Sequence, residues 1–302
     1  MSNGSFFSAP GRRGGTLALV LAALAPLGLG GWLLWDNLGQ GDDDGGTPAS
    51  SLPTVSSTSS PLPAQPPQSP SDSPKSDGKP LTGKVVVLDP GHNPNNRDHT
   101  SEIARRVDIG TNEKECDTTG TATESGYAEA SFTLDVSRRA RALLEARGAT
   151  VKFTQDDDRP YGPCVDERAR IGNSAHADAV VSVHADGAPA GDRGFHVILP
   201  KSVRGGGADT SEIAAPSRRL GEQVRSEFMD ATGSAPADYI GDGSGLNVRG
   251  DLGGLNLSTV PKVFIECGNM RDSKDAGELT DPKWRERAAL GIAQGITDFL
   301  NR

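Results

Sequence analysis

The sequence KVVVLDPGH, residues 84–92, ends an apolar run with a turn and then presents an imidazole. Its consecutive valine and leucine side chains predict a buried strand, and the Pro90-Gly91 pair predicts the turn that ends it. Asp89 is interpreted as part of this turn; the alternative is a carboxylate that orients an imidazole ring. His92 comes directly after the turn and is therefore a candidate for chemistry.

Two later segments repeat this arrangement. VVSVHAD, residues 180–186, and VFIE, residues 263–266, are apolar runs that deliver His184 and Glu266. Strand-like and helix-like patterns alternate along this part of the chain, which predicts an α/β domain with a twisted, mostly parallel sheet flanked by helices. The predicted strands are 84–88, 150–154, 179–184, 195–199 and 262–267, and the predicted helices are 129–147, 165–175, 211–231 and 282–300.

The carboxyl ends of parallel strands meet at one edge of such a sheet, where ligands collect. We expect His92, His184 and Glu266 at that edge, joined by Glu129 if the helix that it opens begins there. Two imidazoles and a carboxylate are a usual ligand set for catalytic zinc, so we predict one Zn²⁺ ion bound by His92, Glu129 and His184. Glu266 is then the expected base for a water molecule whose pKa the zinc lowers.

The first part of the chain is set apart from this domain. Residues 16–35 form an uncharged segment that is long enough to span a bilayer. Arg12-Arg13 precede it, as basic residues commonly do on the cytoplasmic side of a membrane span. We predict an uncleaved signal anchor with residues 1–15 in the cytoplasm; a cleaved signal peptide is the alternative, because proline and glycine interrupt the run. Residues 36–80 are rich in Gly, Ser and Pro and predict a disordered linker. Residues 82–302 are the expected catalytic domain, outside the cytoplasm.

The net charge bears on the binding partner, and the cysteines bear on disulfide formation. The formal net charge of -9 argues against nucleic acid, because phosphate binding needs clustered Lys and Arg. An exported chain permits disulfides, and Cys116 and Cys164 both fall in predicted loops that can meet, so this pair is the expected bridge. Cys267 directly follows Glu266 in a strand and is expected to point away from it as a small buried residue.

Four segments, in this order, resemble the zinc-dependent N-acetylmuramoyl-L-alanine amidases of the amidase-3 family. They are VVLDPGH at 86–92, Glu129 at a helix start, SVHAD at 182–186 and PKVFIECGN at 261–269. The chain is most similar to actinobacterial, mycobacterial-type members, with which it also shares KECD at 114–117, GPCVDER at 162–168, GFHV at 194–197 and LGGLNL at 252–257. The residues after Glu266 depart from those of many members.

This resemblance implies hydrolysis of the amide bond between N-acetylmuramic acid and L-alanine in peptidoglycan, during wall remodelling, turnover or cell separation. It implies the same zinc ligands, catalytic glutamate and disulfide, and it favours Glu129 over the nearby Glu124, because Glu129 directly precedes the apolar helix face. We expect a monomer that acts on peptidoglycan or muropeptides and is attached to the membrane by its N-terminal segment. His196, Asn247 and Arg249 are candidate substrate contacts. His196 is equally interpreted as a solvated residue, and the ordinary polarity of a loop is the alternative for Asn247 and Arg249.

Two other functions remain open from the sequence. One is a catalytically silent wall-binding or regulatory module with the same fold, and the other is a zinc peptidase or deacetylase with a similar site. The presence of all four site residues favours a catalytic protein over a silent one.

Overall fold

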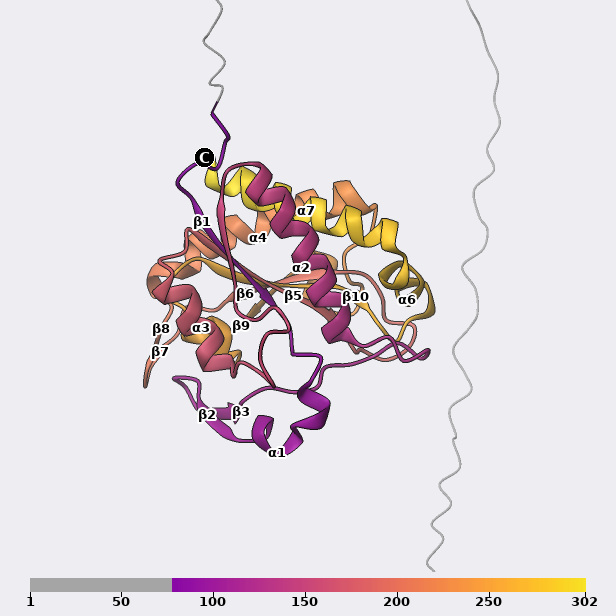
Figure 1. The fold of residues 1–302 in the computed structure, drawn as a ribbon, viewed down its shortest axis with the longest axis horizontal. Helices are drawn as coiled ribbons and strands as arrows, with labels where there is room; N and C mark the ends of the chain where they lie inside the picture. Colours follow the sequence, from indigo (N-terminus) through magenta and orange to yellow (C-terminus); the bar gives the residue numbers. More distant parts are fainter. Residues whose placement is uncertain (1–77) are drawn as a thin grey trace, which may run out of the picture. The chain divides into compact units, whose positions relative to one another are not determined.

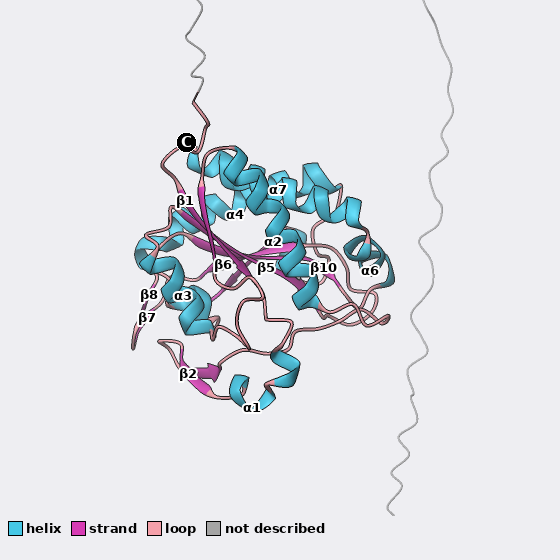
Figure 2. Cartoon of the chain, viewed as in Figure 1, coloured by secondary structure: helices cyan, strands magenta, loops and turns pink. Residues whose placement is uncertain are grey.

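A six-stranded sheet runs through the centre of the domain in the order β4-β1-β5-β10-β6-β9 (Figures 1 and 2). The structure is a computed structural model that describes residues 78–302. Four neighbouring strands are parallel, namely β4 (Thr150–Phe153), β1 (Val85–Pro90), β5 (Ala179–Asp186) and β10 (Lys262–Asn269). β6 (His196–Pro200) is antiparallel to β10, and β9 (Leu246–Arg249) is parallel to β6. The predicted α/β fold is confirmed, with a mixed sheet.

The direction of β6 follows from the short chain that precedes it. Only residues 187–195 connect β5 to β6, whereas a parallel crossover needs roughly a dozen residues or more, usually with a helix. β6 therefore runs back along the sheet, and its first residue, His196, pairs with Glu266 of β10. The edge strand β9 is a further element that the sequence patterns did not predict.

Three long helices cover one face of the sheet (Figure 1). They are α2 (Glu129–Ala146), α4 (Ser211–Thr232) and α7 (Pro282–Leu300), which enclose the main hydrophobic core against the sheet. α3 (Val165–Ser174) lies on the other face, where its Gly172 packs next to Val180 of β5. All four predicted helices agree with these bounds to within one residue at each end.

Shorter elements fill the connections, and the sequence patterns predicted none of them. The helical ones are η1 (Asn96–Asp98), α1 (Thr100–Ile103), η2 (Gly241–Gly243), α5 (Gly253–Asn256) and α6 (Ser273–Thr280). Two small hairpins pair β2 (Arg106–Asp108) with β3 (Glu113–Glu115) and β7 (Arg204–Gly205) with β8 (Ala208–Asp209).

None of the helices between residues 78 and 302 has the length and apolar character of a membrane span. The predicted cytoplasmic segment 1–15, the anchor 16–35 and nearly all of the linker 36–80 lie outside the described residues.

β1 ends in a cluster of buried charges. The carboxylate of Asp89 accepts hydrogen bonds from Arg168 of α3 at 2.8 Å and from Lys262 of β10 at 2.9 Å. Thr154 and Ser182 donate to the same carboxylate, at 2.6 and 2.8 Å. Burial opposes the ionisation of Asp89, but Lys262 and Arg168 outweigh it and hold the pKa of this carboxyl far below its usual range. Asp89 thus joins β1 to α3, β5 and β10, rather than closing the turn as interpreted from the sequence.

α7 crosses α4 at two glycines. A Cβ atom added to Gly291 would lie 2.7 Å from the Cα of Phe228, and one added to Gly295 would lie 2.5 Å from the Cα of Val224. Both contacts are with backbone atoms of α4, which cannot move aside by a change of rotamer as a side chain can. The two helices pack this closely because neither position carries a side chain.

We predict that Gly295→Ala lowers the free energy of unfolding by about 1–3 kcal/mol, because the added methyl group overpacks the contact between α4 and α7. Gly277→Ala in α6 is the matched control, since no atom lies within 4 Å of an added Cβ there. Alanine is the better helix former by roughly 1 kcal/mol, so the control is expected to be neutral or stabilising. Urea unfolding of both variants measures the difference, and a Gly295→Ala variant as stable as the wild type would contradict the close contact.

Candidate active site

Three residues predicted as zinc ligands come together at the carboxyl edge of the sheet. Nε2 of His92 lies 3.1 Å from Oε1 of Glu129, and Nδ1 of His184 lies 2.9 Å from the same oxygen. One potential ligand atom from each residue lies within 4.8 Å of the other two. Glu124, the alternative carboxylate, is exposed.

Different elements deliver these side chains. His92 follows β1 by two residues, and His184 points to the same face of β5 as Ser182. Glu129 is the first residue of α2, which begins at this edge of the sheet as the topology argument expected. Its carboxylate is fixed by backbone N–H groups, since Oε2 accepts from Thr121 at 2.9 Å and Oε1 accepts from Ala185 at 3.3 Å.

The electrostatics of these three residues favour a cation. Burial disfavours the charged form of His92, but Glu129 and Asp117 outweigh it and raise the pKa of His92 to about 10. Burial also disfavours the charged form of Glu129, but His92 and His184 reverse this effect and lower the pKa of Glu129 below its usual range. The Glu129 carboxylate therefore lies between two imidazole rings that favour its charged form.

Glu266 lies in the same cavity as the three predicted ligands. The cavity has a volume of about 240 Å³, and its lining includes Glu266, Asp186 and Arg249. Burial, together with Glu129 and Asp186, raises the pKa of Glu266 well above its usual value. Cys267, the next residue of β10, packs into the main core on the opposite face of the sheet, as strand alternation predicts.

An apolar pocket of about 320 Å³ adjoins this cavity and shares His92, His184, Leu252 and Phe264 with it. The Phe264 ring stacks on His184, with 5.2 Å between the ring centroids. The pocket therefore offers room for an apolar group of a ligand directly beside His184.

The three predicted substrate contacts differ in position. Arg249 lines the cavity and pairs with Asp251 at 2.7 Å, whereas neither His196 nor Asn247 is among the residues that line it. His196 is only 2% exposed, so its interpretation as a solvated residue is wrong. Its ring lies edge-on to Tyr239, at 6.1 Å between centroids.

Cys116 and Cys164, the expected pair, form a disulfide. Cys164 is the residue before α3 and Cys116 follows the β2–β3 hairpin, so the bond joins the hairpin to the start of this helix. Arg105 also donates to Sγ of Cys164 at 3.1 Å.

Three residues around the site were not singled out from the sequence. Asp186 and Phe264 lie two positions from His184 and Glu266 on the same strands, so strand alternation was a signal that could have identified them. Asp117, which lies 3.4 Å from Nδ1 of His92, is in a loop where no periodicity applies.

Comparisons with known proteins agree with one another. Residues 86–298 match the Amidase_3 family, described as N-acetylmuramoyl-L-alanine amidase. The chain is 38% identical over 221 residues to the N-acetylmuramoyl-L-alanine amidase Rv3717 of Mycobacterium tuberculosis, which covers 73% of this chain and 88% of that relative. It is also similar to the crystal structure of the N-acetylmuramyl-L-alanine amidase Ami1 from Mycobacterium smegmatis, with a TM-score of 0.66, 41% identity and coverage of 73% of this chain and 98% of that one. The apo form of Ami1 from Mycobacterium abscessus has the same TM-score of 0.66, with 42% identity and coverage of 73% and 100%.

We predict that Gly91→Ala weakens zinc binding by roughly tenfold or more, because a misplaced ligand side chain costs affinity on this scale. A Cβ atom at Gly91 would lie 2.3 Å from the His184 ring, and hydrogen bonds to Val183 and Thr133 hold the Gly91 backbone in place. Gly205→Ala is the control, because an added Cβ there meets nothing within 4 Å. Competition with a chromophoric chelator measures the affinity, and equal affinities in the two variants would show that the His184 position is not critical.

The buried His196 predicts a pH dependence of stability. Burial lowers the pKa of His196 to about 4, against the opposing effect of Asp186. Because an unfolded histidine has a pKa of about 6.5, the unfolded chain takes up a proton between these values that the folded chain does not, so stability falls as the pH falls. This residue is expected to remove about 2 kcal/mol between pH 7 and pH 5.

Urea unfolding of His196→Gln at both pH values is expected to show a correspondingly smaller loss of stability than the wild type. His176→Asn, at an exposed position, is the control and is expected to behave as the wild type does. An equal loss of stability in His196→Gln and the wild type would refute the assignment to His196.

Proposed function

The chain belongs to the N-acetylmuramoyl-L-alanine amidase family, and from this premise we propose that it hydrolyses the bond between N-acetylmuramic acid and L-alanine with a zinc ion held by His92, Glu129 and His184. Amidase activity on peptidoglycan is a property of this family. The observation that carries the proposal is the convergence of these three ligand atoms beside Glu266 in one cavity at the carboxyl edge of the sheet.

The residues present fit a zinc ion. Two imidazole nitrogens and a carboxylate oxygen are a common ligand set for catalytic zinc, and such sites keep a further position open toward the substrate. The buried Glu129 carboxylate requires a counter-charge, and the ring nitrogens of His92 and His184 already turn toward it. These observations support zinc as the resident cation.

Glu266 is the proposed acid and base of the reaction. When bound, zinc lowers the pKa of water and polarises the carbonyl group of the scissile amide. Glu266 accepts the proton of the attacking water and passes it to the leaving nitrogen as the C–N bond breaks, which gives a free carboxylic acid and a free amine. The raised pKa of Glu266 makes its carboxylate a stronger proton acceptor than that of an exposed glutamate.

We further propose that residues 82–302 act outside the cytoplasm, in remodelling or turnover of the cell wall or in cell separation. An uncharged segment at 16–35 with Arg12-Arg13 before it supports membrane anchoring, with residues 1–15 inside and the Pro-rich segment 36–80 as a spacer. A peptidoglycan substrate, which is part of the cell wall, supports the same location.

We predict that the zinc-loaded full chain releases free stem peptides from purified muropeptides, that a chelator abolishes this activity and that added zinc restores it. Glu266→Gln preserves the size of the side chain but removes the proton acceptor, so kcat is expected to fall roughly hundredfold or more while zinc still binds. Glu124→Gln, at an exposed position, is the control and is expected to keep full activity. Mass spectrometry of the products identifies the bond that is cut.

Other products would contradict this assignment in distinguishable ways. Intact muropeptide in the presence of stoichiometric zinc would indicate a silent binding module. Release of acetate would indicate a deacetylase, and cleavage between two amino acids would indicate a peptidase.

A further inference from the structure

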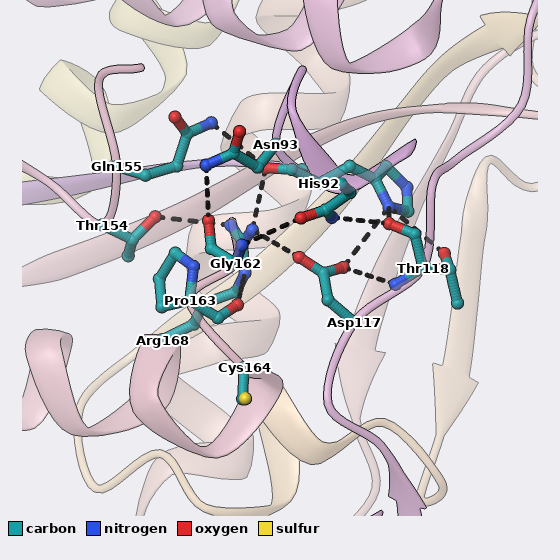
Figure 3. A network of polar contacts seen from close by, with 12 residues as sticks. His92, Asn93, Asp117, Thr118, Thr154, Gln155, Gly162, Pro163, Cys164 and Arg168 are labelled. Carbon is teal, nitrogen blue, oxygen red and sulfur yellow. Dashed lines mark hydrogen bonds and ion pairs between the residues drawn. The ribbon is translucent and has the colours of Figure 1, made fainter. Parts of the chain in front are cut away.

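We propose that Arg168 is the positioning residue for His92, because one guanidinium group contacts both the backbone of His92 and Asp117, one of the two residues whose oxygen atoms the His92 ring faces (Figure 3). The inference rests on the proposed metal site. Arg168 would hold the His92 ring in its ligand orientation before a metal ion binds.

The backbone of His92 needs external support. Its φ of +60° lies in the left-handed region, which residues other than glycine rarely adopt and which persists only where the surroundings enforce it. The carbonyl oxygen of His92 accepts hydrogen bonds from Arg168 at 2.8 Å and from Gln155 at 3.1 Å. The same guanidinium donates to the carbonyl of Pro90 at 2.6 Å, so Arg168 spans the turn from the end of β1 to His92.

The ring of His92 is oriented through its Nδ1 atom. This atom lies 3.0 Å from the carbonyl oxygen of Thr118, 3.2 Å from its hydroxyl and 3.4 Å from Oδ1 of Asp117. A carbonyl and a carboxylate only accept hydrogen bonds, so Nδ1 carries a hydrogen and Nε2 is the nitrogen that turns toward Glu129. A histidine ligand held through its second nitrogen in this way presents the first one in a fixed direction.

Arg168 also anchors the segment that holds the ring. It donates to Oδ2 of Asp117 at 2.9 Å, while Asn96 donates to the carbonyl of Thr118 at 2.7 Å. Figure 3 shows Arg168 between Asp117 on one side and the His92 backbone on the other. The Arg168 guanidinium therefore holds the backbone of His92 and one acceptor residue of its ring, Asp117, while Asn96 holds the other, Thr118.

The geometry calls for arginine rather than any cation. Arg168 donates from Nε to the carbonyl of Pro163 at 2.9 Å, in addition to its bonds to Asp89, Pro90, His92 and Asp117. A lysine keeps the charge, but its single ammonium group cannot donate to His92 and to Asp117 at the same time as the planar guanidinium group does. The substitution Arg168→Lys therefore removes the hydrogen bonds that the guanidinium group makes in several directions and retains the positive charge.

The experiment compares Arg168→Lys and Asp117→Asn with Arg170→Lys in the full chain. Arg170 lies on the same helix but is exposed, and its ion pair with Asp166 is at the surface, so it is the matched control. Zinc affinity is measured by competition with a chelator, and the Nδ1–H proton of His92 is followed by NMR of protein labelled with ¹⁵N-histidine. Thermal unfolding of each metal-free protein shows whether the fold is retained.

Both site variants are expected to bind zinc roughly tenfold to hundredfold more weakly than the wild type. Substitution of a residue that hydrogen-bonds to a metal ligand commonly weakens metal binding by this factor. Their Nδ1–H proton is expected to exchange faster with water, with or without zinc, while Arg170→Lys matches the wild type. A purely structural role for Arg168 would lower the unfolding temperature without changing the exchange of this proton in the folded protein.

Wild-type zinc affinity and wild-type Nδ1–H exchange in folded Arg168→Lys or Asp117→Asn would overturn the proposal. If Arg168→Lys does not fold, Asp117→Asn decides, because it removes one acceptor and leaves the contacts between Arg168 and the turn intact. A failure of the proposed function is distinguishable: it would appear as a wild-type protein that binds no zinc, and the exchange of the Nδ1–H proton in the metal-free protein would still test the positioning of His92.

Discussion

The ion pairs of the buried Asp89 carboxylate are the interaction on which this architecture depends. Lys262 and Arg168 come from β10 and from α3. Without Asp89, Lys262 would be an uncompensated charge in the protein interior, and Arg168 would keep only its pair with Asp117. Breaking one member of such a group is far more costly than breaking a surface pair, because it leaves the other charge buried and alone. The cluster alternates in sign from Lys262 through Asp89 and Arg168 to Asp117, so every member has a partner.

Strand alternation extends this cluster into the site. Ser182 and His184 lie on one face of β5, and Lys262, Phe264 and Glu266 lie on the same face of β10. The residues between them point to the opposite face and form the main core beneath the three long helices. The main core therefore lies on one side of the sheet, and the ionic contacts, the cavity and the candidate ligands lie on the other.

Much of this arrangement could be predicted from local patterns. Apolar runs located the central strands, helical periodicity located the long helices, and the rule that ligands gather at carboxyl ends brought His92, His184 and Glu266 together. The direction of β6 was not predicted, because apolar patterns do not give the direction of a strand; the short connection between β5 and β6 does. The role of Asp89 could not be predicted, because its partners lie 79 and 173 residues away in sequence and a charged residue gives no local sign of burial. The N-terminal segments lie outside the described residues, so their assignments stay predictions.

The position of Leu81, near the start of the described residues, bears on which edge of the domain is free to meet a substrate. Leu81 is fastened to the end of α2 by a hydrogen bond from its N–H to the carbonyl of Arg147, at the amino edge of the sheet and beside the C-terminus of the chain (Figure 1). The cavity lies at the opposite edge, after the end of β1. Any attachment made through the chain before Leu81 therefore lies at the far edge of the domain from the cavity, and it leaves the cavity edge free to face the substrate.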